Sequence, residues 1–129
     1  MLIRPYKHSD YATIASWWEA FGEIGPQEGM MIEDGTFVLE IDEKLALSLT
    51  VFKTQSTIGY LEGYISDPEL DKVARRKNGE ELWNHCFNWA RWQGIKVLIC
   101  YNKPIFVERY EALGMTKSIG NLTSMFKTL

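Results

Sequence analysis

Residues 58–101 decide the fold: IGYLEGYISDPELDKVARRKNGEELWNHCFNWARWQGIKVLICY. Residues 58–66 have the composition of a strand, which the DPE phrase at 67–69 ends. We predict a helix over Glu80–Gln93, because an apolar stripe recurs there at helical spacing and Gly94 supplies a stop. Residues 95–101 are mostly apolar, as in a buried central strand. The stretch therefore predicts strand, helix, strand, with a polar, basic loop over 70–79.

The flanking segments extend this arrangement in both directions. Before residue 58, the patterns predict a strand, a helix, a loop and two more strands, over residues 2–4, 9–22, 23–35, 36–41 and 45–52. After residue 101, Pro104 can open a helix that reaches Leu113. Residues 115–129 have room for two edge strands with Gly120-Asn121 as their turn. No repeat or internal linker interrupts the order, which predicts an α/β fold on one mixed sheet, in a single domain over 1–129.

The composition excludes several classes of protein. The chain has 129 residues, of which 46% are hydrophobic and 24% charged, so it is a globular and not a disordered sequence. It carries 14 Lys and Arg against 17 Asp and Glu, a net charge of -3. An acidic chain lacks the large basic surface that nucleic-acid binding needs. The short basic run over 72–77 is the one feature that favours nucleic-acid binding, which is therefore a minor hypothesis beside the two given below.

The cysteines and the termini indicate where the protein works. Cys86 and Cys100 form no CxxC pair and no cluster with histidine, so we expect free thiols, no metal site and a reducing compartment. On its strand, Cys100 fits a small buried residue better than a nucleophile. The N-terminus has no apolar signal core, and no long apolar run suits a membrane helix. These features predict a cytoplasmic protein with no membrane partner.

Three phrases of the chain resemble one known family. They are Ile3-Arg4-Pro5 followed by Ser9-Asp10, the phrase ISDPE at 65–69, and the phrase YEALGM at 110–115 with Met125-Phe126-Lys127 near the end. Together they span nearly the whole chain, and in this order they resemble the GNAT superfamily of N-acetyltransferases. The resemblance implies a GNAT-like acyl-CoA N-acyltransferase fold, with a central mixed, twisted sheet and helices on both faces.

The resemblance also implies a binding site for acetyl-CoA as cosubstrate. The strand before Asp67 and the strand over 95–101 would splay apart, and the coenzyme would lie in the gap with its pyrophosphate at the loop that opens the long helix. With Gly79 on the second glycine of the family phrase Gln/Arg-x-x-Gly-x-Gly/Ala, Lys77 stands on the first glycine and Ala74 on the Gln/Arg. A shifted register, Arg76-x-x-Gly79, matches two positions but leaves Glu81 on the last. The residues implied for the coenzyme are Ile65, Ser66, Arg75, Arg76, Lys77, Asn78, Gly79 and Asn102. Asn102 equally suits a helix N-cap ahead of Pro104.

Two residues are candidates for catalysis, and three for acceptor binding. Tyr110 matches the family tyrosine that protonates the departing thiolate, or it is a core tyrosine. Glu62 lies where some family members carry a general base, or it is an exposed strand glutamate. Strand alternation would place Glu62, Tyr64 and Ser66 on one face. The candidates for binding the acceptor are Trp18, Glu23 and Tyr64. The alternative for each is that it only packs in the core or lies on the surface.

The resulting hypothesis is an N-acetyltransferase that moves acetyl from acetyl-CoA to a primary amine by direct attack, with Glu62 or an ordered water taking the proton. The acceptor would be a small molecule or a peptide. A homodimer, common in the family, is compatible with the sequence. The alternative is a catalytically inactive binding or regulatory module on the same fold, which the departures near Gly79 and the acidic Glu80-Glu81 pair favour.

Overall fold

The computed structural model describes residues 1–120, 122, 123 and 125–129. Within these residues the strands form one sheet whose spatial order is the chain order: β1 (Leu2–Pro5), β2 (Thr36–Ile41), β3 (Lys44–Lys53), β4 (Ile58–Ser66) and β5 (Val97–Ile99). The strands from β1 to β4 pair antiparallel, and β5 pairs with β4 in parallel. The predicted α/β fold with one mixed sheet is confirmed.

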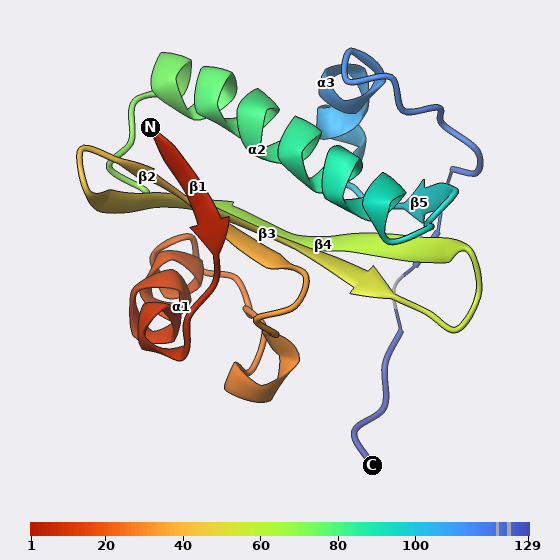
Figure 1. The fold of residues 1–129 in the computed structure, drawn as a ribbon, viewed down its shortest axis with the longest axis horizontal. Coiled ribbons are helices and arrows are strands. Elements are labelled where there is room, and N and C mark those ends of the chain that lie inside the picture. Colours follow the sequence, from red (N-terminus) through yellow and green to blue (C-terminus); the bar gives the residue numbers. More distant parts are fainter. Residues whose placement is uncertain (121, 124) are drawn as a thin grey trace.

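The helices cover both faces of this sheet. α1 (Tyr11–Ala20) lies on one face, and α2 (Lys72–Trp92) crosses the other with α3 (Val107–Glu111) beside it (Figure 1). Short helical turns η1 (His8–Asp10), η2 (Glu28–Met30) and η3 (Pro104–Phe106) stand in the connections. Leu61 and Trp83 belong to the apolar cluster under α2, whereas Val38 and Ile65 belong to the cluster under α1. No helix in the described part of the chain is long and apolar enough to cross a bilayer.

Helix α2 begins well before the predicted start at Glu80. Asp71 is extended, and its carboxylate accepts a hydrogen bond of 2.9 Å from the amide of Ala74, which is the contact of an N-cap. Residues 74–77 (ARRK) are good helix formers, but they place no large apolar stripe on the sheet. Apolar periodicity therefore could not reveal these first turns. The predicted end is confirmed, because Gly94 takes a φ of 80° directly after the helix.

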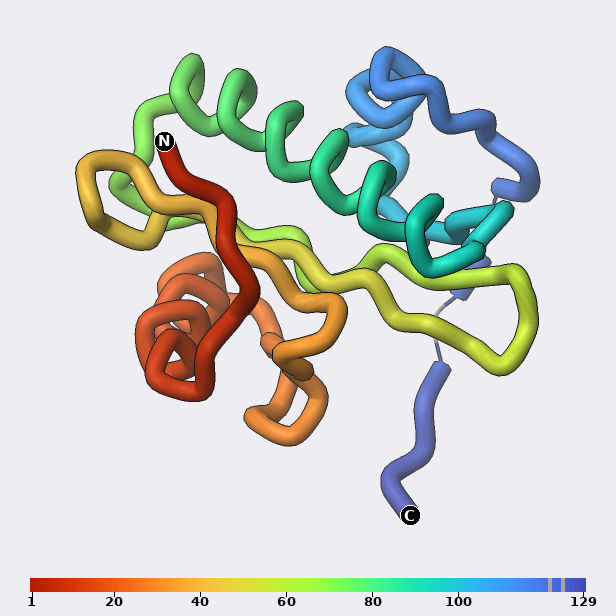
Figure 2. The backbone as a smooth tube through the Cα atoms, in the orientation of Figure 1, coloured from red at the N-terminus to blue at the C-terminus, as the bar shows by residue number. Residues whose placement is uncertain are grey.

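The chain after α2 differs from the prediction in two places. The strand is confined to Val97–Ile99, and Val97 is 54% exposed, so β5 is an edge strand of the described sheet and not a buried central one. The two edge strands predicted within 115–129 are wrong for the described residues there, which form neither helix nor strand. Asn121 of the predicted turn lies outside the described residues. The end of the chain lies on the side of the sheet that carries α1 (Figure 2).

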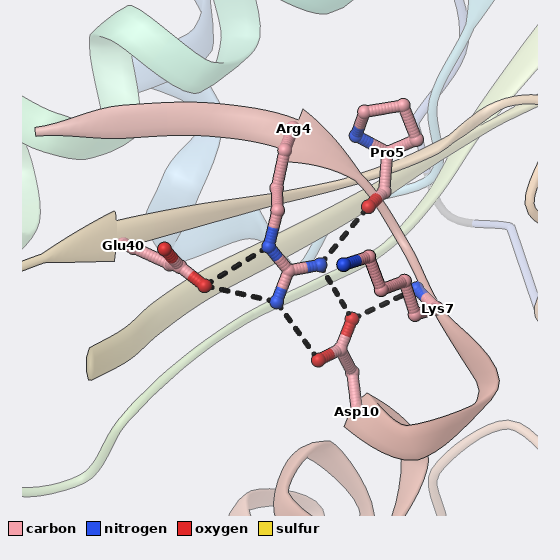
Figure 3. A network of polar contacts seen from close by, with 5 residues as sticks. All are labelled: Arg4, Pro5, Lys7, Asp10 and Glu40. Carbon is pink, nitrogen blue, oxygen red and sulfur yellow. Dashed lines mark hydrogen bonds and ion pairs between the residues drawn. The ribbon is translucent and has the colours of Figure 1, made fainter. Parts of the chain in front are cut away.

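An ionic cluster joins β1, β2 and the start of α1. Arg4 donates to both carboxylate oxygens of Asp10, at 2.8 and 2.9 Å, and to Glu40 at 2.9 Å (Figure 3). The Lys7 amide also donates to Asp10, at 2.8 Å. Asp10 occupies the N-cap position of α1, but its side chain makes no cap hydrogen bond to this helix and binds Arg4 instead. The cluster fixes the entry into α1, which forms one wall of the site described below.

The substitution Asp10→Asn should lower the free energy of unfolding by about 2 kcal/mol, because Arg4 would lose a charged, mostly buried partner. Burial by itself raises the pKa of Asp10, but the hydrogen bonds from Arg4 and the Lys7 amide outweigh it and hold this pKa below its ordinary value. The stabilisation is therefore present near neutral pH and is lost as the pH falls through the lowered pKa. Urea unfolding at pH 7 and at acid pH measures both effects.

A matched control is Glu28→Gln, which alters the exposed contact of Glu28 with His8 at 3.2 Å and should change stability little. Equal stability of Asp10→Asn and the unmodified protein at pH 7 would show that the cluster does not stabilise the fold.

Candidate active site

A cleft opens where β4 and β5 separate. The two strands pair only from Ile58 opposite Val97 to Tyr60 opposite Ile99. Beyond Tyr60, the rest of β4 has no partner on that side among the described residues. A cleft of about 330 Å³ lies at this divergence. The predicted site residues that line it are Trp18, Glu23, Glu62, Tyr64, Ile65, Ser66, Arg75, Asn102 and Tyr110.

A bulge in β4 decides which residues face which side of the sheet. Glu62 is opposite Thr50 and Ile65 is opposite Ser48, so Gly63 and Tyr64 together oppose a single residue of β3. Gly63 takes a φ of 71°, a conformation that glycine adopts without strain. The extra residue shifts the alternation of side chains along the strand. Glu62 and Tyr64 therefore do not share a face, and the expectation that they would is wrong.

Glu62 lies on the face that carries α1. Its partner Thr50 contacts the hydroxyl of Thr36 at 3.0 Å, and Thr36 lies two residues from Val38, a member of the cluster under α1. Glu62 is half-buried, and burial raises the pKa of its carboxyl. The alternative of an ordinary exposed glutamate is therefore wrong for the position of this side chain. A half-buried carboxylate with a raised pKa is a stronger base than an exposed one.

Tyr110 enters the cleft from the opposite face, the one that carries α2. It is only 8% exposed, and its ring centroid lies 4.9 Å from that of Trp83 on α2. Burial raises the pKa of Tyr110 to about 12. Tyr110 packs in the core, as one alternative states, and it also lines the cleft. Its role as an acid stays a prediction. At physiological pH its hydroxyl keeps its proton and can donate it.

The mouth of the cleft is framed by loops from distant parts of the chain. Lys103, before η3, forms an ion pair with Glu23, after α1. Asn102 accepts a hydrogen bond of 3.4 Å from the Cys100 thiol, whose pKa burial raises to about 11. Lys103 holds the N-cap position of η3, so the alternative of Asn102 as an N-cap is wrong. The cleft therefore has an acidic and a basic residue at its mouth, already paired with each other.

The predicted phosphate loop over 75–79 is wrong, because these residues form part of α2. Their amides therefore bond to carbonyl groups one turn back, as the Arg75 amide does to the Asp71 carbonyl at 2.9 Å. Of the five residues, only Arg75 lines the cleft. Arg76 and Lys77 are exposed, and the Asn78 side chain donates to the Ala74 carbonyl at 2.7 Å.

Gly79 has a packing role. A Cβ at this position would lie 2.2 Å from the Tyr64 hydroxyl oxygen and 3.3 Å from the Arg109 Nη2 atom. The absence of a side chain thus allows α2 to approach β4 closely. Sequence reasoning missed Arg109, which precedes Tyr110 and lines the cleft with it. A basic residue next to the tyrosine of the YEALGM phrase was the only available signal.

The substitution Gly79→Ala should destabilise the protein by about 1–3 kcal/mol through overpacking against Tyr64. In a helix free of such a contact, the same change stabilises by about 0.5–1 kcal/mol, so the sign is diagnostic. Urea unfolding of Gly79→Ala, Tyr64→Phe and the double variant measures the coupling, and removing the hydroxyl should recover part of the loss. A Gly79→Ala protein more stable than the original would contradict this packing.

Comparison with known proteins gives matches at the level of structure. No protein-family model matches the sequence, and no curated protein matches it. The glucosamine-6-phosphate N-acetyltransferase of Arabidopsis thaliana is 15% identical with a TM-score of 0.73, and the match covers 98% of each chain. An aminoglycoside acetyltransferase from an uncultured soil metagenomic sample, in complex with trehalose, is 15% identical with a TM-score of 0.72, over 99% of this chain and 95% of that one.

A third match includes the coenzyme. N-acetylglutamate synthase from Neisseria gonorrhoeae, in complex with coenzyme A and N-acetyl-glutamate, is 21% identical with a TM-score of 0.68, over 86% of this chain and 27% of that one. These structural neighbours are GNAT acetyltransferases, and they share the mixed sheet with helices described above. The chain therefore has the fold of the GNAT acetyltransferases.

Proposed function

We propose that the protein is an N-acetyltransferase that moves acetyl from acetyl-CoA to a primary amine by direct attack. The observation that carries this proposal is the placement of Glu62 and Tyr110. They line one cleft from opposite faces of the sheet, at the point where β4 and β5 part. Acetyltransferases among the structural neighbours, several of them in complex with coenzyme A, support the same reading.

The residues of the cleft fit the arm of acetyl-CoA. The half of β4 beyond Tyr60 lacks a neighbouring strand on the β5 side among the described residues, so backbone groups near Ile65 and Ser66 are available to an extended amide-containing chain. Asn102 lies at the rim of the same cleft. Arg75 has a buried Nε atom without a hydrogen-bond partner in the described structure, which suits an anionic ligand.

The two titratable side chains divide the proton transfers. When bound, acetyl-CoA supplies an acetyl group activated as a thioester. In its ionised form Glu62 accepts a proton from the ammonium group of the acceptor, directly or through an ordered water, and the neutral amine that remains attacks the thioester carbonyl. Tyr110, which keeps its proton below its pKa of about 12, donates it to the departing sulfur. Backbone amides of β4 polarise the carbonyl group, and the cleft holds the reacting groups in line.

The acceptor is a small-molecule or peptide amine in this proposal. Trp18 and Glu23 belong to the α1 side of the cleft, the side from which Glu62 projects. Glu23 carries a negative charge that a cationic acceptor can use when it displaces Lys103. Tyr64 projects to the opposite face and is held there by Trp83, at 5.6 Å between ring centroids, so we assign it to the coenzyme side and not to the acceptor. The cytoplasm remains the proposed location, and a homodimer the proposed assembly.

An assay of thiol release tests this function. The protein is mixed with acetyl-CoA and one amine at a time, from amino sugars to peptides with a free amino terminus. The release of free thiol is recorded, and mass spectrometry identifies the acetylated product. Thiol release that depends on one class of amine is the expected result. If calorimetry detects no binding of acetyl-CoA at millimolar concentration, and no amine promotes thiol release, the proposal is wrong.

A second candidate function is a binding module that keeps the fold without the reaction. The helical conformation of residues 75–79 and the Asp71 cap favour it, because both occupy amides that a phosphate would otherwise use. A protein that shows no heat and no thermal shift with acetyl-CoA at millimolar concentration, and that transfers acetyl to no amine, would fit this module.

A further inference from the structure

Two arginine side chains in the cleft lack acidic partners. Arg75, in the first turn of α2, and Arg109, on α3, both line it and are half-buried. Neither forms an ion pair with a carboxylate of the described residues, whereas Lys103 at the same cleft is paired with Glu23. Withdrawing a guanidinium from water without a counter-charge costs stability. An unpaired couple of this kind indicates a site for an anion.

Arg109 contacts Tyr64, and Arg75 lies one helical turn before Gly79, the residue next to the Tyr64 hydroxyl. Arg109 Nη2 donates to the Tyr64 hydroxyl at 3.4 Å, and its guanidinium carbon lies 5.8 Å from the centre of the Tyr64 ring. Burial raises the pKa of Tyr64, while the positive charges of Arg109 and Arg75 act in the opposite direction. Both charges are thus close enough to influence the same oxygen atom. Gly79 keeps this corner narrow, since a side chain there would collide with the hydroxyl.

The Arg75 side chain is held in place, but not all of its hydrogen-bond donors have an acceptor. Its Nη2 atom donates to the Leu70 carbonyl at 3.0 Å, and its guanidinium carbon lies 5.9 Å from the centre of the Phe21 ring. The Nε atom is buried and has no hydrogen-bond partner among the described residues. A buried donor left without an acceptor is rare in proteins unless a ligand supplies one.

Two backbone amides at the start of α2 are already used within the protein. The Ala74 amide is taken by the Asp71 carboxylate and the Arg75 amide by the Asp71 carbonyl. A phosphate at this helix end would also meet the negative charge of Asp71. Guanidinium groups, by contrast, bind phosphate oxygens through paired, charge-assisted hydrogen bonds.

We propose that the side chains of Arg75 and Arg109 bind the diphosphate of the coenzyme, in place of the backbone amides at the start of the long helix. The inference rests on the proposed function for the identity of the ligand. The anion site itself does not depend on catalysis, so it can be tested with inorganic pyrophosphate as well as with coenzyme A.

Titration calorimetry with coenzyme A, pantetheine and inorganic pyrophosphate tests the pair. Arg75→Gln and Arg109→Gln should each weaken binding of coenzyme A about tenfold or more, and weaken pyrophosphate binding likewise, while leaving pantetheine binding unchanged. Arg76→Gln is the matched control, because Arg76 is exposed on the same turn of α2 and does not line the cleft. It should change each affinity less than about twofold. Added salt should weaken coenzyme A binding less in the two cleft variants than in the original protein.

Equal thermal unfolding temperatures would show that the variants are folded. Two results overturn the inference: binding of coenzyme A or pyrophosphate that neither cleft variant weakens, and an original protein that binds neither anion. If pyrophosphate binds and depends on both arginines while acetyl-CoA does not bind, the anion site stands and the proposed acetyl transfer fails. Coenzyme binding and turnover that are insensitive to both arginines would leave the transfer standing and the site disproved.

Discussion

Tyr110→Phe should lower the turnover number about a hundredfold or more while the affinity for acetyl-CoA stays the same. The expected loss is that of a general acid, since phenylalanine keeps the ring but has no proton to give the departing sulfur. The ring contact with Trp83 at 4.9 Å does not need the hydroxyl, so the variant should remain folded. Steady-state kinetics, combined with calorimetric titration of acetyl-CoA, separates the two effects.

Tyr60→Phe is the matched control for Tyr110. Tyr60 lies on the part of β4 that pairs with β5 and does not line the cleft, so its hydroxyl should be dispensable. Turnover by Tyr110→Phe at the original rate would remove this residue from the mechanism. A loss that appears only in the affinity for acetyl-CoA would make Tyr110 a packing residue of the cleft.

Glu62→Gln should also lower turnover about a hundredfold at neutral pH, because the side-chain amide cannot take a proton from the acceptor's ammonium group to leave the neutral amine that attacks. The pH dependence gives a second signature. Burial raises the pKa of Glu62, and only the ionised carboxylate is active, so the rate should fall as the pH falls through a value above the ordinary glutamate pKa of about 4.3. This acidic limb should disappear in Glu62→Gln, and pH–rate profiles of the two proteins measure it.

Glu19→Gln, an exposed change on α1, controls for the loss of one negative charge on this side of the sheet. An unchanged acidic limb in Glu62→Gln would assign that limb to another group. Full turnover in the variant, with the limb intact, would indicate that an ordered water or the acceptor itself handles the proton without Glu62.

Most of the fold could be predicted from the sequence, because its strands combine alternating patterns with strong turn signals. The predicted bounds of β2 and β4 match the structure, and the predicted strand over 45–52 lies within β3. The start of α2 could not be found in this way, since its first turns are polar and depend on the Asp71 cap. The tail after Met115 has apolar residues but no partner segment that the sequence identifies.

The site could be predicted only in part. The family resemblance implied that Glu62, Ile65 and Tyr110 belong to one site, and in the structure all three line the cleft. The separation of Glu62 from Tyr64 could not be predicted, because a single extra residue at Gly63 reverses the alternation of the strand. The position of Arg109 in the cleft could not be predicted either, because it depends on how closely α3 lies to α2, which no local sequence pattern encodes.

The structure of the complex with coenzyme A, solved by crystallography, tests the central claim most directly. The account predicts that the arm runs along the unpaired half of β4 and that the sulfur lies between Glu62 and Tyr110. Coenzyme A bound away from the cleft, or β4 and β5 joined along their whole length so that no cleft remains, would contradict it.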